Sequence, residues 1–145
     1  MEALVRTIPH PFLIASEAVA DIKRIAVAYD GSQGAVRALA AAADIVQNWR
    51  GDRPELLVIE VAPADGDGSG VLASAEAYLE LYGLTCRTLV ARGRPAEALP
   101  QIAANQEVDL LCMGAFSHSR VRDFVLGSTT LAVLEGRRKP VLLCH

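Results

Sequence analysis

Residues 25–32 read IAVAYDGS, an apolar run that ends in Asp-Gly-Ser, a turn and helix-cap sequence. An Ala-rich segment follows, and it predicts a helix over residues 35–48. Short apolar runs that alternate with helical segments are typical of a parallel sheet wrapped by helices. The stretch therefore predicts an α/β fold.

The same alternation continues to the end of the chain. Apolar or edge-like runs predict four further strands, over residues 56–59, 85–90, 110–113 and 141–144. Helices are predicted over residues 71–82, from Pro95 onward, and over 128–137. Pro100 should kink the second of these helices, because proline has no backbone N–H. Strands of this kind fit a doubly wound sheet with helices on both faces.

Length and charge fit one compact domain. The chain has 145 residues, of which 52% are hydrophobic and 21% charged, and its formal net charge is −3. No run of basic residues is longer than the triplet at 137–139, so no nucleic-acid surface is predicted. No apolar stretch approaches the roughly 18 residues of a membrane span, and the first residues lack the order of a secretory signal.

The three cysteines are Cys86, Cys112 and Cys144, an odd number with wide spacing. Two of them lie in apolar runs, which predicts buried, reduced thiols. We therefore expect a cytoplasmic protein that binds neither nucleic acid nor membrane.

A short internal repeat links the two ends of the sequence. Residues 3–14 match residues 132–143, with Pro140 standing 129 positions after Pro11. Chance similarity of aliphatic residues is one explanation, but the shared prolines and alanines favour a true repeat. Residues 12–15 are then expected to add a strand beside Val141, either within one chain or by crossing to a partner. The alternative is a frayed N-terminal arm.

Residues able to carry chemistry gather in the second half of the chain. Gly114 ends the strand predicted over 110–113, and Gly127-Ser128-Thr129 opens the last helix. Glycine lets a backbone approach a ligand closely, and the free N–H groups at a helix start favour an anion. Ligands of open α/β sheets bind at this end of the strands, where Asp30 would border the same crevice. The sequence therefore predicts a site shaped for a mononucleotide.

With these motifs the chain resembles the universal stress protein family over about residues 23–145. The phosphate and ribose motif of that family is Gly-x-x-Gly, nine residues, then Gly-Ser/Thr. Gly114, Gly127 and Ser128 match its spacing, whereas Ser117 stands in place of the second glycine. Residues 114–120 look most like the second domains of tandem members. The resemblance then makes residues 1–22 the end of a preceding domain plus a linker.

The resemblance implies a fold, a ligand and a partner. The fold would be an open five-stranded parallel sheet in the order 3-2-1-4-5, as in adenine nucleotide alpha hydrolase-like proteins. Asp30 and Val61 would contact the adenine of ATP or AMP, with Mg²⁺ accompanying ATP. The ribose and phosphates would lie among Gly114, Ser117, Gly127, Ser128 and Thr129. A homodimer would form through the last strand, at Val141, Leu142 and Leu143.

These residues also have purely structural interpretations. Asp30 could serve only to cap the turn into the first helix, and Gly127-Ser128 could be only a helix start. A side chain at Ser117 would narrow the phosphate loop, although its hydroxyl could donate to a phosphate. No nucleophile–base pair or metal-ligand cluster is apparent, so we expect no enzyme, and any ATP hydrolysis should be slow. Two functions stay open: a dimeric stress-response module that binds nucleotide weakly, and a dimeric interaction module that does not.

Overall fold

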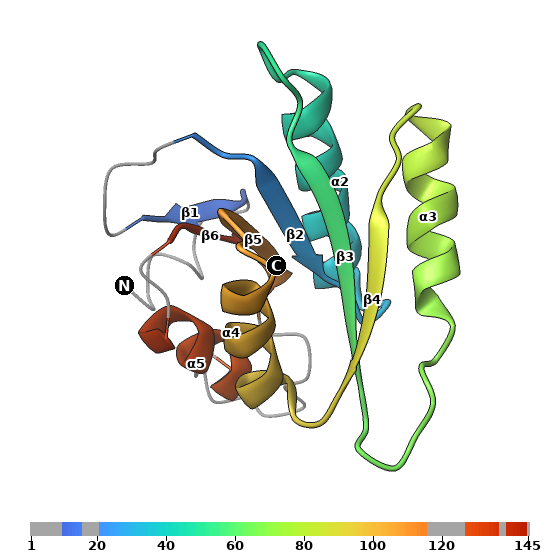
Figure 1. The fold of residues 1–145 in the computed structure, drawn as a ribbon, viewed down its shortest axis with the longest axis vertical. Coiled ribbons are helices and arrows are strands. Elements are labelled where there is room, and N and C mark those ends of the chain that lie inside the picture. Colours follow the sequence, from blue (N-terminus) through green and yellow to red (C-terminus); the bar gives the residue numbers. More distant parts are fainter. Residues whose placement is uncertain (1–9, 16–20, 116–126, 137–138, 145) are drawn as a thin grey trace.

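The computed structural model describes residues 10–15, 21–115, 127–136 and 139–144. In this part of the chain six strands form one sheet, and four helices pack on it (Figure 1). The strands are β1 (Phe12–Ile14), β2 (Arg24–Ala28), β3 (Glu55–Ala62), β4 (Arg87–Arg92), β5 (Leu110–Gly114) and β6 (Val141–Cys144). The helices are α2 (Gln33–Gln47), α3 (Val71–Leu81), α4 (Pro95–Asn105) and α5 (Ser128–Gly136).

The sheet has the strand order β1-β6-β5-β2-β3-β4. Strands β2 to β6 pair in parallel, and together they reproduce the predicted order 3-2-1-4-5. The resemblance implied five strands, and β1 adds a sixth, antiparallel strand outside β6, where the sequence repeat predicted one. The α/β fold class is therefore confirmed, with a mixed sheet in place of a purely parallel one.

Two apolar layers lie on opposite faces of the sheet. Buried residues of α2 and α3 form one layer, and those of α4 and α5 form the other. Figure 1 shows α4 and α5 together on the side of the sheet away from α2. Successive strand residues serve the two layers in turn, as Ile25 and Val27 face α2 while Ala26 faces the α4–α5 layer. Burial on both faces explains the nearly continuous apolar runs in the sequence.

Helix starts follow the expected chemistry. Ser32 caps α2, because its Oγ accepts a hydrogen bond of 3.2 Å from the Ala35 N–H. Pro95 occupies the first turn of α4, where its missing N–H costs nothing. Pro100 lies inside α4 as predicted, and the kink there stays a prediction.

β1 pairs with β6 inside one chain, which is the first of the two predicted outcomes and not the frayed arm. The pairs are Phe12↔Leu143, Leu13↔Leu142 and Ile14↔Val141. The predicted homodimer needs the outer edge of β6 to be free, and in this chain β1 occupies that edge. A dimer through β6 therefore cannot form in this conformation, because each edge of a strand pairs with only one other strand.

Asp109 ties the starts of three strands together. Its Oδ2 accepts hydrogen bonds from the backbone N–H groups of Lys23 at 2.9 Å and of Arg24 at 3.0 Å. Lys139 donates to its Oδ1 at 2.8 Å. The carboxylate before β5 thus holds the residues that open β2 and precede β6.

We expect Asp109→Asn to lower the free energy of unfolding at pH 7 by about 2 kcal/mol, the scale of hydrogen bonds to a charged group. Burial raises the pKa of Asp109, but the bonds from Lys139, Lys23 and Arg24 outweigh it and hold that pKa below its usual value. A lowered folded-state pKa stabilises the fold above the unfolded value of about 3.9 and loses that effect as pH falls below it.

Urea denaturation at pH 7 and pH 3 measures this effect. The difference in free energy of unfolding between wild type and Asp109→Asn should be smaller at pH 3 than at pH 7. An equal difference at both pH values would contradict this prediction. Asp67→Asn is the control, because the side chain of Asp67 is 97% exposed in its ion pair with Arg92 and should matter little.

Candidate functional site at the carboxyl edge of the sheet

The carboxyl ends of β2, β3 and β5 lie at the same edge of the sheet. In the pairing register, the last residue of β2 lies opposite Ile59 of β3 and Met113 of β5. Asp30 and Val61 follow two residues beyond this level, and Gly114 follows one residue beyond it. The structure therefore brings three of the predicted site residues to one edge of the sheet, where open α/β folds bind ligands.

Asp30 shapes the turn between β2 and α2. Its Oδ1 accepts a 2.9 Å hydrogen bond from the N–H of Ser32, and Gly31 between them has a φ of 78°. Ser32, and not Asp30, caps the helix. Asp30 therefore stabilises the turn before α2 but does not cap the helix. Its side chain remains exposed at the carboxyl edge.

Val61 is half-buried on the face of the sheet that α4 and α5 cover. Strand alternation turns the preceding residue, Glu60, to the opposite face. Val61 therefore offers an apolar surface on the same face as α5, the helix whose first residues were predicted to hold phosphates.

Gly114 is pressed against the first turn of α2. A Cβ at this position would lie 2.8 Å from the carbonyl carbon of Gly34 and 2.9 Å from the Ala35 nitrogen. A Cβ on Gly34 would in turn lie 3.1 Å from the Gly114 Cα. The first glycine of the predicted motif therefore has a packing role that needs no ligand, and its partner Gly34 was missed by sequence reasoning.

The start of α5 is open. A Cβ on Gly127 would meet nothing within 4 Å among the described atoms, and both Gly127 and Ser128 are exposed. The Leu131 N–H donates to the Gly127 carbonyl at 3.1 Å, so the helix begins there and leaves the first N–H groups of Ser128 and Thr129 for other partners. Ser117, the remaining predicted residue, lies outside the described residues.

Sequence reasoning also missed Glu60, a carboxylate that is 5% exposed. Its Oε1 accepts hydrogen bonds of 2.6 Å from both the N–H and the Oγ of Ser69. Tyr29 on the neighbouring strand makes a 3.3 Å hydroxyl contact with Ser74 Oγ. These two contacts tie the start of α3 to the sheet. The signal in the sequence was a single charged residue inside the apolar run over 56–62.

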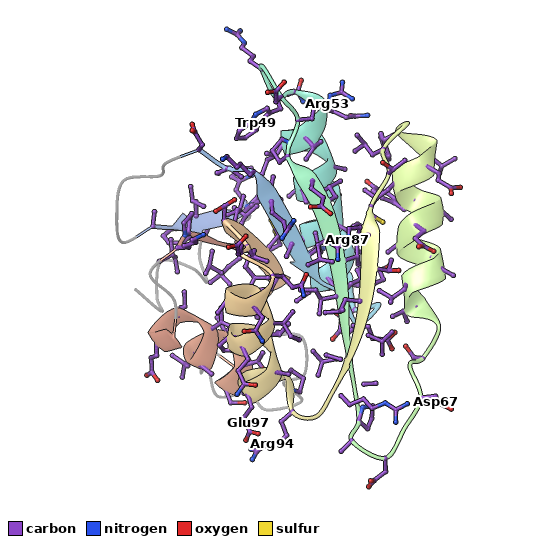
Figure 2. The ribbon with its side chains drawn as sticks, viewed as in Figure 1. Trp49, Arg53, Asp67, Arg87, Arg94 and Glu97 are labelled. Carbon is purple, nitrogen blue, oxygen red and sulfur yellow. The ribbon has the colours of Figure 1, made fainter. Side chains whose placement is uncertain are left out.

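Exposed ion pairs also lie at the carboxyl edge of the sheet, around the ends of β3 and β4. Arg92 pairs with Asp67, and Arg94 pairs with Glu97, each at 3.1 Å. Figure 2 shows Asp67, Arg94 and Glu97 at one end and Arg53 at the other. Exposed pairs contribute little to stability, so these arginines can exchange their partners for an anion at small cost.

The described residues offer neither a metal cluster nor an activated thiol. Within the described ranges no three His, Cys, Asp or Glu side chains gather into a metal site. Cys112 and Cys144 are buried and free, as predicted. Burial raises the pKa of both thiols, that of Cys144 to about 11, so neither forms a thiolate near pH 7. In the same part of the chain, no helix is long and apolar enough to cross a membrane.

Two surface hollows lie at the opposite, amino-terminal edge of the sheet. The larger, of about 540 Å³, is lined by Lys23, Asp109 and Lys139 among others, and the smaller, of about 430 Å³, by Glu55 and Arg87 among others. Several of their charged groups are already paired in the Asp109 network and in the Glu55–Arg87 ion pair. These hollows do not coincide with the predicted nucleotide site.

Comparisons with known proteins agree on one family. A model of the universal stress protein family matches residues 21–145. Universal stress protein Slr1230 from Synechocystis sp. is 34% identical over 144 residues, a match that covers 98% of this chain and 49% of that protein. The chain therefore spans about half the length of this relative.

Solved structures show the same fold. A universal stress protein from Archaeoglobus fulgidus DSM 4304 superposes with a TM-score of 0.78 at 27% identity, over 99% of this chain and 52% of that one. A universal stress protein in complex with cAMP superposes with a TM-score of 0.69 at 23% identity, over 87% of this chain and 98% of that one.

Proposed function

Because the chain belongs to the universal stress protein family, we propose that it is a stress-response protein that binds ATP or AMP weakly at the carboxyl edge of its sheet. The observation that carries this proposal is that Asp30, Val61 and Gly114 lie at the carboxyl edge of adjacent parallel strands, within two residues of one level. The relative bound to cAMP supports the ligand class, since cAMP contains adenine, ribose and phosphate.

Each part of the nucleotide would meet a different group. Asp30 and Val61 would contact the adenine. The first N–H groups of α5, at Ser128 and Thr129, would face the phosphates, because a helix start favours negative charge. Gly127 leaves room for close approach of the ligand. Gly114 would act indirectly, since its contact with Gly34 sets how close α2 lies to β5.

The proposed activity is binding and not catalysis. Since the described residues form no three-ligand metal cluster, Mg²⁺ would be held chiefly by the phosphates of ATP. We also place the protein in the cytosol, because its three cysteines are free and two of them are buried.

The assembly proposal has two parts. We propose that residues 23–145 correspond to the second domain of tandem relatives and residues 1–22 to the end of a preceding domain plus a linker. Slr1230 supports this, because it is about twice as long and matches 98% of the chain. We also propose a homodimer through Val141, Leu142 and Leu143 wherever the outer edge of β6 is free. In the second candidate function, an interaction module that binds no nucleotide, this edge of β6 would be the functional surface.

Replacing Ser117 by glycine is expected to tighten ATP and AMP binding about fivefold, or roughly 1 kcal/mol, because glycine restores the family motif and leaves the phosphates more room. Isothermal titration calorimetry of both proteins with millimolar nucleotide measures the effect. Absence of heat for both proteins would leave the interaction module as the function. Weaker binding by Ser117→Gly would instead identify the Ser117 hydroxyl as a ligand of the phosphate.

A further inference from the structure

The smaller hollow at the amino-terminal edge of the sheet lies just before the point where β3 and β4 begin to pair. The first pair of these strands is Leu57↔Arg87, although β3 itself begins at Glu55. The residues before this pair, 53–56 on one segment and 83–86 on the other, line a hollow of about 430 Å³. The hollow is therefore bounded by two segments of main chain that do not pair with each other there.

The inner lining of the hollow is apolar. Val46 of α2 contributes to it together with Leu56 and Leu84, and all three side chains are buried. The half-buried Cys86 lies beside them. Burial raises the pKa of the Cys86 thiol, and the nearby carboxylates of α3 raise it further. The thiol is therefore uncharged near pH 7 and adds to the apolar lining.

The charged side chains of the hollow leave it positive. Its lining contains one carboxylate, Glu55, and two guanidinium groups, those of Arg53 and Arg87. Glu55 is neutralised mainly by Arg24, which lies outside the hollow and contacts its Oε2 at 2.7 Å, whereas Arg87 contacts its Oε1 at 3.2 Å. Arg53 forms no ion pair within the described part of the chain. One arginine is thus unpaired, and the other shares a partner that already has a closer one.

We propose that this hollow binds a small aliphatic carboxylate, with its carboxylate group at Arg53 and Arg87 and its hydrocarbon chain against the apolar lining. The planar fork of a guanidinium group matches the two oxygens of a carboxylate. Arg87 can exchange Glu55 for this ligand at small cost, because its side chain is 56% exposed and Arg24 stays with Glu55. The inference does not rest on the proposed nucleotide site, which lies at the opposite edge of the sheet.

The charges around Cys86 fix the orientation of the ligand. Glu76 and Glu80 of α3 act electrostatically on the Cys86 thiol. They would repel a carboxylate at that side of the hollow, since like charges disfavour each other. The charged end of the ligand therefore belongs at the two arginines, and its uncharged end lies toward Cys86.

The larger hollow at the same edge lacks this balance of charges. Lys23 and Lys139 line it, but so do Glu107 and Asp109, and Lys139 already contacts Asp109 at 2.8 Å. Its lining also includes residues from the last turns of α4 and α5. The carbonyl end of a helix favours cations over anions. A carboxylate is therefore favoured in the smaller hollow and not in the larger one.

A titration of the full chain with sodium hexanoate, followed by the amide NMR signals of Leu84 and Thr85, tests the proposal. Sodium acetate supplies the charge without the chain, and 1-hexanol supplies the chain without the charge. Hexanoate should bind at least about tenfold more tightly than either compound. Unchanged Leu84 and Thr85 signals at millimolar hexanoate would overturn the proposal. Equal affinity for hexanol and hexanoate would overturn the assigned role of the arginines.

Three variants separate the two arginines from the general charge of the surface. Arg53→Gln and Arg87→Gln should each weaken hexanoate binding about tenfold and leave hexanol binding unchanged. Arg50→Gln is the matched control, because it removes the same charge from an exposed residue outside the hollow. Its affinity for hexanoate should equal that of wild type. Equal weakening by Arg50→Gln and Arg53→Gln would mean that no specific site binds the carboxylate.

Alkylation of Cys86 by the neutral reagent iodoacetamide gives a second measure inside the hollow. Cys112 and Cys144 are buried, so Cys86 should react first. Saturating hexanoate should slow this reaction at constant pH. ATP should not slow it, because the nucleotide site is proposed at the other end of the molecule, away from Arg53 (Figure 2). Equal protection by ATP would show that the hollow takes a nucleotide, and would overturn the carboxylate assignment.

Discussion

Replacing Gly114 by alanine is expected to lower the free energy of unfolding by about 3 kcal/mol, the upper part of the range for overpacked interiors. The added methyl group would lie 2.8 and 2.9 Å from backbone atoms of Gly34 and Ala35. Backbone atoms cannot rotate away as a side chain can. The first turn of α2 would have to move off β5, and the Ala-rich contact that buries Ala35 and Ala38 would open. Urea denaturation, with the slope compared between proteins, measures the loss.

Gly127→Ala is the matched control within the same sequence motif. Among the described atoms, a Cβ at this position meets nothing within 4 Å, so the loss should stay below about 1 kcal/mol, the cost of alanine at a helix cap. The same variant should weaken nucleotide binding, because a methyl group at the open start of α5 keeps the phosphates away. Equal losses of stability in both variants would contradict the division of roles. The two glycines would then share one role in folding.

The positions of the buried strands were predictable because these strands are apolar on both faces, whereas their order was predicted from the resemblance to the family. The runs over 110–113 and 141–144 match β5 and β6 to within one residue. The bounds of β4 were less predictable. This edge strand, Arg87–Arg92, begins two residues later than predicted, because four of its six residues are exposed and give no continuous apolar run.

The glycine spacing predicted where a nucleotide site should lie, but not which glycine is structural. That distinction depends on the contact between Gly34 and Gly114, which lie 80 positions apart in the sequence and meet only when α2 crosses β5. The repeat likewise predicted a strand beside Val141 without choosing between one chain and two. The structure shows the pairing within one chain, because β1 lies beside β6 of the same chain.

The burial of Glu60 could not be predicted from the sequence, because it depends on how the loop that follows β3 folds back. A charged residue near the end of a strand is usually exposed, and nothing before folding indicates that residues 63–70 will cover it. In the structure a Cβ on Gly68 would lie 3.0 Å from Glu60 Oε2, so the loop crosses directly over the carboxylate. Burial of a charge requires donors, and the N–H and hydroxyl of Ser69 supply them.

Glu60→Ala is accordingly expected to cost about 3 kcal/mol, since it removes a buried acceptor with two short hydrogen bonds and leaves a cavity. Glu60→Gln keeps the shape and an acceptor oxygen but loses the charge, so its loss should be about half as large. Both values come from urea denaturation, and each variant should also speed hydrogen exchange at the Ser69 amide. That amide reports directly on whether the loop has left the carboxylate.

A double-mutant cycle with Ser69→Ala separates the hydrogen bond from the cavity. Ser69→Ala alone removes the hydroxyl but keeps the backbone N–H bond, so it should cost about 1 kcal/mol. If the Ser69 hydroxyl binds Glu60 in solution, the double variant should lose less than the sum of the single losses, by about 1 kcal/mol. Additive losses would mean that the Ser69 hydroxyl does not bind Glu60. In that case Glu60 would hold the start of α3 through the Ser69 N–H and through packing.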